Sequence, residues 1–462
     1  MIFLILSLAA FLRLFALEPN LVFHGELGDN YLAVKNIISS GQIPLLGPAT
    51  SHPWLSFGPL YYWLISPVMA AFNFDPAAVA IAMAVTQIIL VFVNFYFIGK
   101  LFTKKAALIS SFLIAVSPLF VNLARQSRFY SLVTLFFYPF IYFLITGRLF
   151  WTGFFFGVML NFHLTPIVLI PAAAIYLVKK KIAVKGVVNL VLGLSIPSIP
   201  FLIHNFTTGF EMLKNLTLWV PYRVAGFVGV VPKNSPTGVT ILNNFYSLGG
   251  LVSGAFSYRL LFGFVFVLLV LGYIIWQIKK NWKEPKIDNE FLLVLIFIFG
   301  YAGIFIHGNP PIHYYLPLYS LPVIFVSLIL ARIKSKEIIF LILFGVAVLN
   351  LRFFFSKNWF YQDNTRIYPN GEIPYNLQLE ASNSIVKDAD GRRYSIRRVG
   401  DYDYFDQNYS QNYRYLLWLK GLEPETDQKL VYTVYEKTPE AGNDEKIVFE
   451  KGGVFVTKRI GK

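Results

Sequence analysis

Residues 77–99 read AAVAIAMAVTQIILVFVNFYFIG, an apolar run of 23 residues that Lys100, Lys104 and Lys105 follow closely. A helix of about twenty apolar residues is what crosses the hydrocarbon core of a bilayer, because a helix satisfies its own backbone polar groups there. Similar runs recur along the first 355 residues. We therefore expect an α-helical, polytopic membrane protein with about eleven transmembrane helices.

The eleven predicted spans share an apolar core with polar or basic borders. They cover approximately residues 2–17, 77–99, 106–123, 131–146, 149–162, 166–178, 187–203, 260–278, 291–306, 314–331 and 338–355. With 56% hydrophobic and 14% charged residues, the composition excludes an ordinary soluble protein. The first run is short enough for a cleaved signal peptide, but no basic segment precedes it, which favours a retained span.

The charged residues are distributed very unevenly. The formal charge is +15, yet residues 356–462 hold 16 basic and 16 acidic residues, so the excess lies among the apolar runs. Fifteen of the 24 basic residues before position 356 occupy five short connections, namely Lys100, Lys104, Lys105, Arg148, Lys179, Lys180, Lys181, Lys185, Lys279, Lys280, Lys283, Lys286, Arg332, Lys334 and Lys336. Short loops rich in Lys and Arg stay in the cytoplasm, so the charge predicts membrane orientation rather than nucleic-acid binding.

The remaining connections are expected on the extracytoplasmic side. They include two long loops, 18–76 and 204–259. A path of eleven spans that begins inside ends outside, so residues 356–462 should also be extracytoplasmic. We expect a transmembrane domain over 1–355, in the plasma membrane, followed by an exoplasmic soluble domain. With no cysteine in the chain, disulfides and Cys-ligated metals are excluded.

The tail, 356–462, carries the patterns of a small α+β domain. Residues 430–435 and 452–457 are rich in β-branched and aromatic residues, which predicts two strands. Residues 374–387 have the periodicity of an amphipathic helix.

Acidic residues are rare on the predicted outer side. Before position 356 they are Glu18, Glu26, Asp29, Asp75 and Glu211. Glu26 and Asp29 stand together in a glycine-containing segment, 24–31, where a tight turn would let the backbone approach a ligand. Asp29 precedes a helical pattern over 30–39, so its alternative role is an N-cap. For Glu26 the alternative is an exposed loop carboxylate.

Four further motifs lie on the predicted outer side, the first in the long loop 18–76 and the other three at ends of spans. They are Gly-Pro-Leu-Tyr-Tyr at 58–62, Ala-Arg-Gln-Ser-Arg-Phe-Tyr at 124–130, Phe-His-Leu-Thr-Pro at 162–166 and His-Tyr-Tyr-Leu-Pro at 313–317. Three residues apart at a helix start, Arg125 and Arg128 would present both guanidinium groups to one phosphate. Their alternative role is snorkelling at a span end. His163 and His313 lack the spacing of a helical metal pair, so we predict no metal site.

With Glu26 and these motifs in this order, most of residues 1–330 resembles the C-type (GT-C) membrane glycosyltransferases of the protein O-mannosyltransferase and aminoarabinose-transferase kind. The resemblance implies an inverting transfer of a sugar from a polyprenyl-phosphate carrier to a lipid, glycan or protein acceptor on the exoplasmic face. Glu26 is the first candidate for the general base and Asp29 the second. The expected donor-phosphate ligands are Arg125, Arg128, Tyr130, His313 and Tyr314, and the expected substrate-binding residues are Tyr61, Tyr62 and His163. Because the carboxylate in this family is usually aspartate, the choice of base stays open.

The main alternative function is a membrane transporter or lipid flippase. Such proteins normally place charged residues or broken helices near the middle of the membrane. Here the centres of the apolar runs contain almost no ionisable residues, which favours the glycosyltransferase. A non-catalytic anchor for the tail would need far fewer spans. The expected partners are membrane lipid, the lipid-linked donor and an acceptor of unknown identity, with no cofactor beyond the donor.

Overall fold

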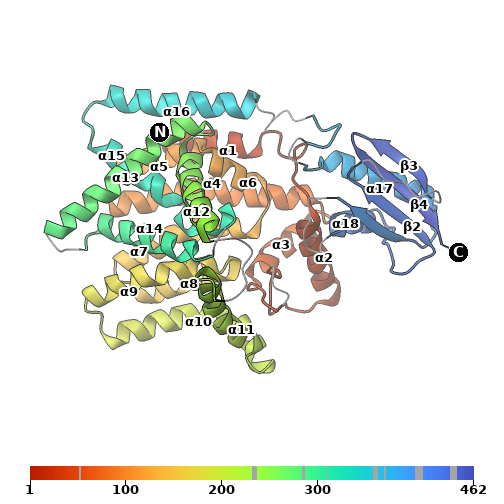
Figure 1. The fold of residues 1–462 in the computed structure, drawn as a ribbon, viewed down its shortest axis with the longest axis horizontal. Coiled ribbons are helices and arrows are strands. Elements are labelled where there is room, and N and C mark those ends of the chain that lie inside the picture. The colour runs from red at the N-terminus through yellow and green to blue at the C-terminus, as the bar shows by residue number, and fades with distance from the viewer. Residues whose placement is uncertain are drawn as a thin grey trace.

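The computed structural model describes residues 1–50, 54–230, 237–283, 287–307, 310–356, 363–368, 371–400, 409–437 and 445–461. Up to Ser356 the described chain is mainly helical, and a four-stranded sheet follows at one end of the molecule (Figure 1). Most of the helices before the sheet run along the long direction of the molecule as one bundle (Figure 1). Their apolar side chains form one continuous hydrophobic core.

The helices of the bundle and of the segments beside it follow in chain order. They are α1 (Ile2–Leu14), α2 (Gly25–Ser40), α3 (Leu60–Ala71), α4 (Pro76–Leu101), α5 (Lys104–Val116), α6 (Pro118–Arg125), η1 (Phe129–Ser131), α7 (Leu132–Ile145), α8 (Leu149–Phe162), η2 (Thr165–Leu169), α9 (Ile170–Lys179), α10 (Val184–Thr207), α11 (Glu211–Phe227), α12 (Thr237–Phe256), α13 (Leu260–Lys283), α14 (Asn289–Phe305), η3 (Ile312–Leu318), α15 (Ser320–Arg332) and α16 (Lys336–Ser356). The η elements are 3₁₀ helices.

Each of the eleven predicted spans coincides with one apolar helix or with one helix pair. By length and composition, however, only α4, α10, α13 and α16 are sufficient to cross a membrane within the described residues. The pairs α5–α6 and η3–α15, bent by 57° and 47°, raise this number to six if each pair is one span. The expected number differs because hydropathy does not register where a helix breaks, and several of the runs are divided by prolines and 3₁₀ turns.

The break between α5 and α6 is held by side chains from distant helices. Arg13, in α1 and fully buried, donates to the carbonyl oxygens of Ile114 and Ala115, each at 3.1 Å. Asn350, in α16, donates to the carbonyl of Val116 at 3.0 Å. The last carbonyls of a helix have no partner within it, so these three contacts satisfy groups that the bend would otherwise leave unpaired.

The expected outer loop over 204–259 contains two helices, α11 and α12. In α12, Leu251, Val252 and Phe256 are almost fully buried. Phe256 stacks on Phe266 of α13 with ring centroids 4.2 Å apart. This segment is therefore partly a component of the bundle, which its interspersed polar residues and glycines concealed in the sequence.

The C-terminal part contains α17 (Tyr375–Ala389), α18 (Gln411–Leu419) and the strands β1 (Ser395–Val399), β2 (Leu430–Tyr435), β3 (Lys446–Lys451) and β4 (Val454–Ile460). The sheet order is β1-β2-β4-β3, in which β1 runs parallel to β2 and the other pairs are antiparallel. The predicted small α+β domain is confirmed. The second predicted strand starts at Val454 because Gly452 and Gly453, at positive φ, form the turn before it.

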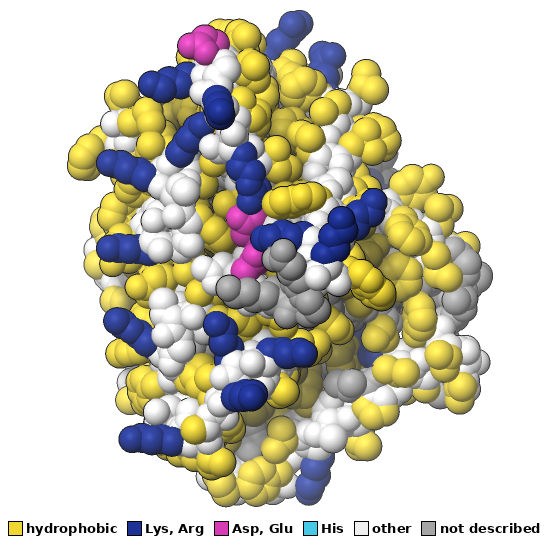
Figure 2. Space-filling view, turned by 90° about the vertical axis from the view of Figure 1, so that its left-hand side faces the viewer, with side chains coloured by type: hydrophobic (Ala, Val, Ile, Leu, Met, Phe, Trp, Pro, Cys, Tyr) yellow, Lys and Arg dark blue, Asp and Glu magenta, His cyan; other side chains and the backbone are white. Residues whose placement is uncertain are grey.

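The two ends of the molecule differ in charge. The end that lies on the left in Figure 1, where α9 joins α10 and α13 ends, faces the viewer in Figure 2. Lys and Arg side chains are spread over this face, and few Asp or Glu side chains are visible on it (Figure 2). The sheet lies at the opposite end of the long axis (Figure 1).

Candidate active site

The segment with the two carboxylates is helical. Helix α2 begins at Gly25, with His24 as its N-cap residue, and Glu26 lies in its first turn. A carboxylate there interacts favourably with the positive end of the helix dipole. The predictions of a tight turn and of an N-cap role for Asp29 are wrong, because the helix starts earlier than expected and places Asp29 inside it. The burial of Leu27, Tyr31 and Val34 on one face of α2 accounts for this earlier start.

Glu26 forms an ion pair with Arg128, which is distant in sequence. The Nη1 atom of Arg128 lies 2.6 Å from Oε2 of Glu26, and the two side chains are only 20% and 35% exposed. Arg128 stands at the N-cap position of η1, at the end of the broken span α5–α6. The sequence predicts that these two groups share a site, and the structure brings them into direct contact.

Aromatic residues from three separate segments, namely η1, η3 and the turn after α8, lie around Arg128. Its guanidinium carbon lies 5.7 Å from the ring centroid of Tyr130. Tyr130 stacks on His313, with centroids 4.8 Å apart and ring planes inclined by 14°. His163 lies 5.8 Å from His313 and 5.3 Å from Tyr314, centroid to centroid. Four of the predicted donor-phosphate ligands therefore form one cluster with His163, and this cluster contacts Glu26 through Arg128.

His163 is held by its own loop. Its Nδ1 atom lies 2.9 Å from Oγ1 of Thr165, and its ring stacks on Phe57 at 5.4 Å. Burial, followed by the nearby His313, lowers the pKa of His163 well below its ordinary value. The imidazole is accordingly neutral at pH 7, so it offers hydrogen bonds rather than charge.

Tyr61 and Tyr62 connect α3 to the other parts of the site. The hydroxyl of Tyr61 donates to the carbonyl of Ser127 at 3.4 Å, and that of Tyr62 donates to Oδ1 of Asn30 at 3.0 Å. Both side chains are buried. These contacts fix α3 beside α2 and beside the backbone that precedes Arg128.

Arg125 is directed away from Glu26. Its guanidinium donates to the carbonyls of Phe15 at 2.8 Å and Ala16 at 2.9 Å, just beyond the end of α1. The expectation that Arg125 and Arg128 act on one phosphate is not met. Helix α6 ends at Arg125 and Ser127 adopts a φ of 55°, so the two arginines are not three residues apart on one helix.

Asp29 has a partner that the sequence analysis did not identify. Nε2 of Gln411, in α18, donates to Oδ1 of Asp29 at 3.3 Å. Burial raises the pKa of the Asp29 carboxyl, the hydrogen bond from Gln411 acts to lower it, and the charge of Glu26 raises it further. Gly28 is the one sign of this neighbour in the sequence, because a glycine allows another group to approach the backbone closely. The sequence alone suggests a ligand in that place, whereas the structure places α18 there.

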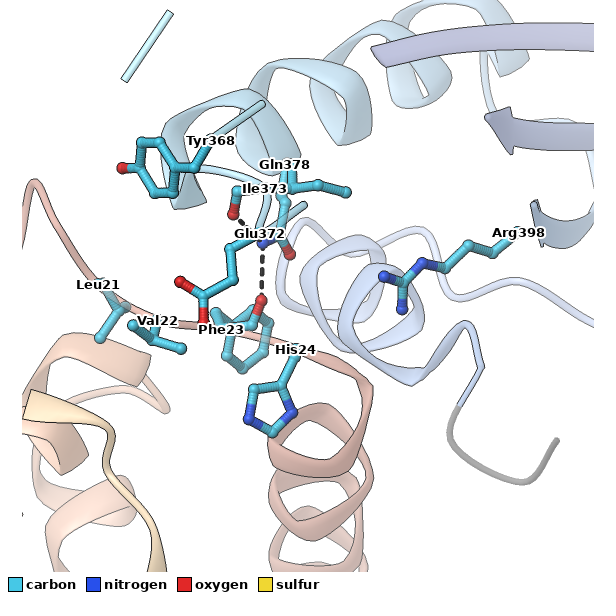
Figure 3. A pocket seen from close by; sticks show the side chains of 9 residues that line it. All are labelled: Leu21, Val22, Phe23, His24, Tyr368, Glu372, Ile373, Gln378 and Arg398. Carbon is cyan, nitrogen blue, oxygen red and sulfur yellow. Dashed lines mark hydrogen bonds between the residues drawn. The ribbon is translucent and has the colours of Figure 1, made fainter. Parts of the chain in front are cut away.

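His24 was also missed as part of this region. Its pKa is lowered well below the ordinary value, first by burial and then by the charges of Arg128 and Arg398. It lines a small pocket where the segment before α2 meets the C-terminal part, together with Gln378 and Arg398 (Figure 3). In the part of the chain that the structure describes, no three His, Cys, Asp or Glu side chains gather as metal ligands would.

Comparison with solved structures identifies the fold as that of the C-type glycosyltransferases. ArnT from Cupriavidus metallidurans bound to undecaprenyl phosphate matches with a TM-score of 0.65 and 11% identity, over 99% of this chain and 97% of that chain. An oligosaccharyltransferase from Archaeoglobus fulgidus in complex with Zn and sulfate matches with a TM-score of 0.53 and 13% identity, over 94% of this chain and 67% of that one. AglB from the same organism, with an inhibitory peptide and a dolichol-phosphate, gives 0.50 and 11%, over 94% and 69%.

Part of the chain also matches a sequence family. Residues 51–204 match the model of the family described as dolichyl-phosphate-mannose-protein mannosyltransferase. This confirms the resemblance drawn from the motifs. The match contains Arg128 and His163, whereas Glu26 and His313 lie outside it. No curated protein matches the chain by sequence.

Proposed function

We propose that this protein transfers a sugar from a polyprenyl-phosphate carrier to an acceptor on the extracytoplasmic side of the membrane. The observation that carries the proposal is the half-buried contact between Glu26 and Arg128 among aromatic residues at converging helix ends. The structurally similar ArnT binds undecaprenyl phosphate, and AglB is in complex with a dolichol-phosphate. The family of residues 51–204 is named for a dolichyl-phosphate-linked donor.

The chemistry needs one base and one positive charge. The acceptor hydroxyl attacks the anomeric carbon, and its proton passes to a carboxylate, Glu26 first and Asp29 second. The bond between the anomeric carbon and the phosphate oxygen breaks, and the carrier leaves as a phosphate anion. Arg128 stabilises that anion, since a fixed guanidinium in a partly dehydrated site interacts strongly with phosphate. The reaction inverts the anomeric configuration.

The ion pair between Glu26 and Arg128 suits a donor-free enzyme. Each group neutralises the other while the site is open to water. A donor phosphate that binds Arg128 competes with the Glu26 carboxylate and frees it to accept a proton. We propose that Tyr130, His313 and Tyr314 also contact this phosphate, and that Tyr61, Tyr62 and His163 border the sugar. Arg125 is left out, because its donors are used at the end of α1.

The charge of the end opposite the sheet supports a membrane orientation. The basic face of Figure 2 would lie in the cytoplasm, as short Lys- and Arg-rich loops do. The C-terminal sheet, at the opposite end, would then be extracytoplasmic, in the plasma membrane. We propose no cofactor beyond the donor, since Arg128 supplies the positive charge.

A direct test uses the purified protein in detergent with a panel of undecaprenyl-phosphate sugars. Release of undecaprenyl phosphate, followed by mass spectrometry, reports turnover whatever the sugar is. Glu26→Gln should reduce the rate by about a hundredfold or more, because a positioned base contributes about 10²–10⁴. Asp29→Asn tests the second candidate base. Glu18→Gln, an exposed carboxylate on the same side, should leave the rate unchanged. Full activity of both Glu26→Gln and Asp29→Asn would refute the proposed base.

A further inference from the structure

We propose that α18 of the C-terminal part is a positioning element of the active site, and that Gln411 and Asn412 hold the helix that carries Glu26 and Asp29. This inference rests on the proposed function. The carboxylates lie near the N-terminus of the chain, whereas the residues that hold them lie far away in sequence. Gln411 follows Asp29 by 382 residues.

The first observation is a contact between the backbones of α2 and α18. A Cβ atom added at Gly28 would lie 2.4 Å from the backbone nitrogen of Asn412 and 2.4 Å from the backbone carbon of Gln411. Real Cβ atoms do not approach backbone atoms so closely, so glycine alone fits here without a shift of one helix. Gly28 stands between Glu26 and Asp29, which means that α18 touches α2 where both carboxylates leave it.

The second observation is that Gln411 holds Asp29 directly. Its Nε2 atom donates to Oδ1 of Asp29 at 3.3 Å. The other groups that act on Asp29 come from α2 and α3: Glu26 raises its pKa, and the hydroxyl of Tyr62 is sensitive to the Asp29 charge. The amide therefore fixes the orientation of the carboxylate and favours its ionised form.

The third observation is a buried polar network that ends at the start of α2. The side chains of Asn412 and Gln378 are each 1% exposed, and Nδ2 of Asn412 donates to Oε1 of Gln378 at 2.8 Å. Nε2 of Gln378 then donates to the carbonyl of Phe23 at 2.7 Å. Figure 3 shows Gln378 directed at this carbonyl, immediately before His24 and the first turn of α2.

The network is anchored in the sheet. Arg398, in β1, and Glu436, just after β2, form an ion pair at 2.6 Å, and their side chains are 2% and 3% exposed. Nη1 of Arg398 also donates to the carbonyl of Tyr409 at 3.1 Å, directly before α18. Buried polar groups that are hydrogen-bonded to one another fix one geometry, because each unsatisfied alternative is costly. The sheet thereby determines where α18, and through it α2, is placed.

The test uses the full-length protein and the undecaprenyl phosphate release assay. Gln411→Leu keeps the size of the side chain and removes its hydrogen bond to Asp29. We expect kcat to fall about tenfold, the effect of one hydrogen bond of ordinary strength in a transition state, with KM for the donor nearly unchanged. Because Gln411 acts to lower the pKa of Asp29, its loss should also raise the pKa of that carboxyl, and where Asp29 is the base the acidic limb of the pH–rate profile moves to higher pH.

Two further variants separate positioning from general docking. Lys35→Met removes the ion pair between Lys35 of α2 and Glu423, at 2.7 Å, which joins the same two parts without touching either carboxylate. Its kcat and pH profile should equal those of the unmodified protein. The double variant Gln411→Leu with Asp29→Asn should lose no more activity than Asp29→Asn alone, since Gln411 acts through Asp29.

The outcomes are distinct. If Gln411→Leu behaves like Lys35→Met, or if the losses of the double variant multiply, the positioning role is refuted while the glycosyltransferase activity stands. If the unmodified protein releases no undecaprenyl phosphate from any donor, the proposed function fails first. Thermal unfolding of each variant, followed by intrinsic fluorescence, shows whether a lost rate comes from lost folding.

Discussion

Two ion pairs of equal length between glutamate and arginine lie at opposite ends of the bundle, apart from the Arg398–Glu436 pair of the C-terminal part. Glu26 and Arg128 are 2.6 Å apart near the C-terminal part, and Glu290 and Arg332 are 2.6 Å apart at the basic end. Their surroundings differ. The Glu290 carboxylate also accepts hydrogen bonds from Tyr273, at 2.6 Å, and from Gln277.

The two carboxylates differ in how many side-chain donors they bind. Glu290 joins the ends of α13, α14 and α15, and its oxygen atoms have three donors. Among the described residues, the side-chain hydrogen bond that reaches the Glu26 carboxylate comes from Arg128. A saturated carboxylate stabilises the fold, whereas one with unused lone pairs is available to a substrate. The length of an ion pair therefore does not distinguish a structural pair from the pair that we propose to be catalytic.

Removing the arginine from each pair should produce the largest contrast. Arg128→Gln should lower the rate of undecaprenyl phosphate release by about 10²–10³, the effect of one donor aimed at developing charge. Its melting temperature should change little. Arg332→Gln should keep the rate per folded molecule and lower the melting temperature. Equal losses of rate in both variants would remove the distinction.

Removing Glu290 from its pair tests whether this carboxylate stabilises the fold. Glu290→Ala leaves the Tyr273 hydroxyl, the Gln277 amide and the Arg332 guanidinium without their acceptor. We expect a loss of about 2 kcal/mol in the free energy of unfolding, given that Arg332 is partly exposed. Thermal unfolding in detergent measures it, with Glu337→Ala, at an exposed carboxylate in the first turn of α16, as the control. No loss of stability would contradict the structural role.

Arg125 offers an intermediate case, since it lies near Arg128 in sequence but bonds the end of α1. Arg125→Met should preserve most of the aliphatic packing and leave the carbonyls of Phe15 and Ala16 without their donor. The expected cost is about 1–2 kcal/mol of stability. The rate per folded molecule should remain close to that of the unmodified protein. A loss of activity as large as that of Arg128→Gln would return Arg125 to the phosphate site.

The smallest effect concerns pH and Asp29. Burial raises the pKa of its carboxyl in the folded protein, so the folded state binds more protons than the unfolded state between the two pKa values. Its contribution to stability is therefore fully present below the unfolded pKa and is lost as pH rises through the folded pKa. Asp29→Asn should therefore raise the melting temperature slightly at neutral pH, and this gain over the unmodified protein should shrink as pH falls through the folded pKa. A gain that grows towards low pH would contradict the assignment.

The sequence predicted the elements that depend on local pattern. Apolar runs located eleven helical segments, alternation located β2, and the family motifs located Glu26, Arg128 and the aromatic residues around them. Arg125 was misassigned because the helix break at Ser127, with its positive φ, depends on tertiary packing. Gln411 could not have been identified, because a contact across 382 residues leaves no trace in composition or periodicity.

Helix α2 touches α18 at Gly28, and the two helices of this contact are synthesised far apart in time. The ribosome makes Glu26 and Arg128 early, whereas Asn412 emerges only when most of the chain has been inserted. Until the C-terminal segment reaches α2, a nascent chain contains Glu26 and Arg128 but lacks the backbone of α18 that contacts α2 at Gly28. Under the proposed function, a chain cut short before α18 should therefore not turn over lipid-linked donors, even with its bundle intact.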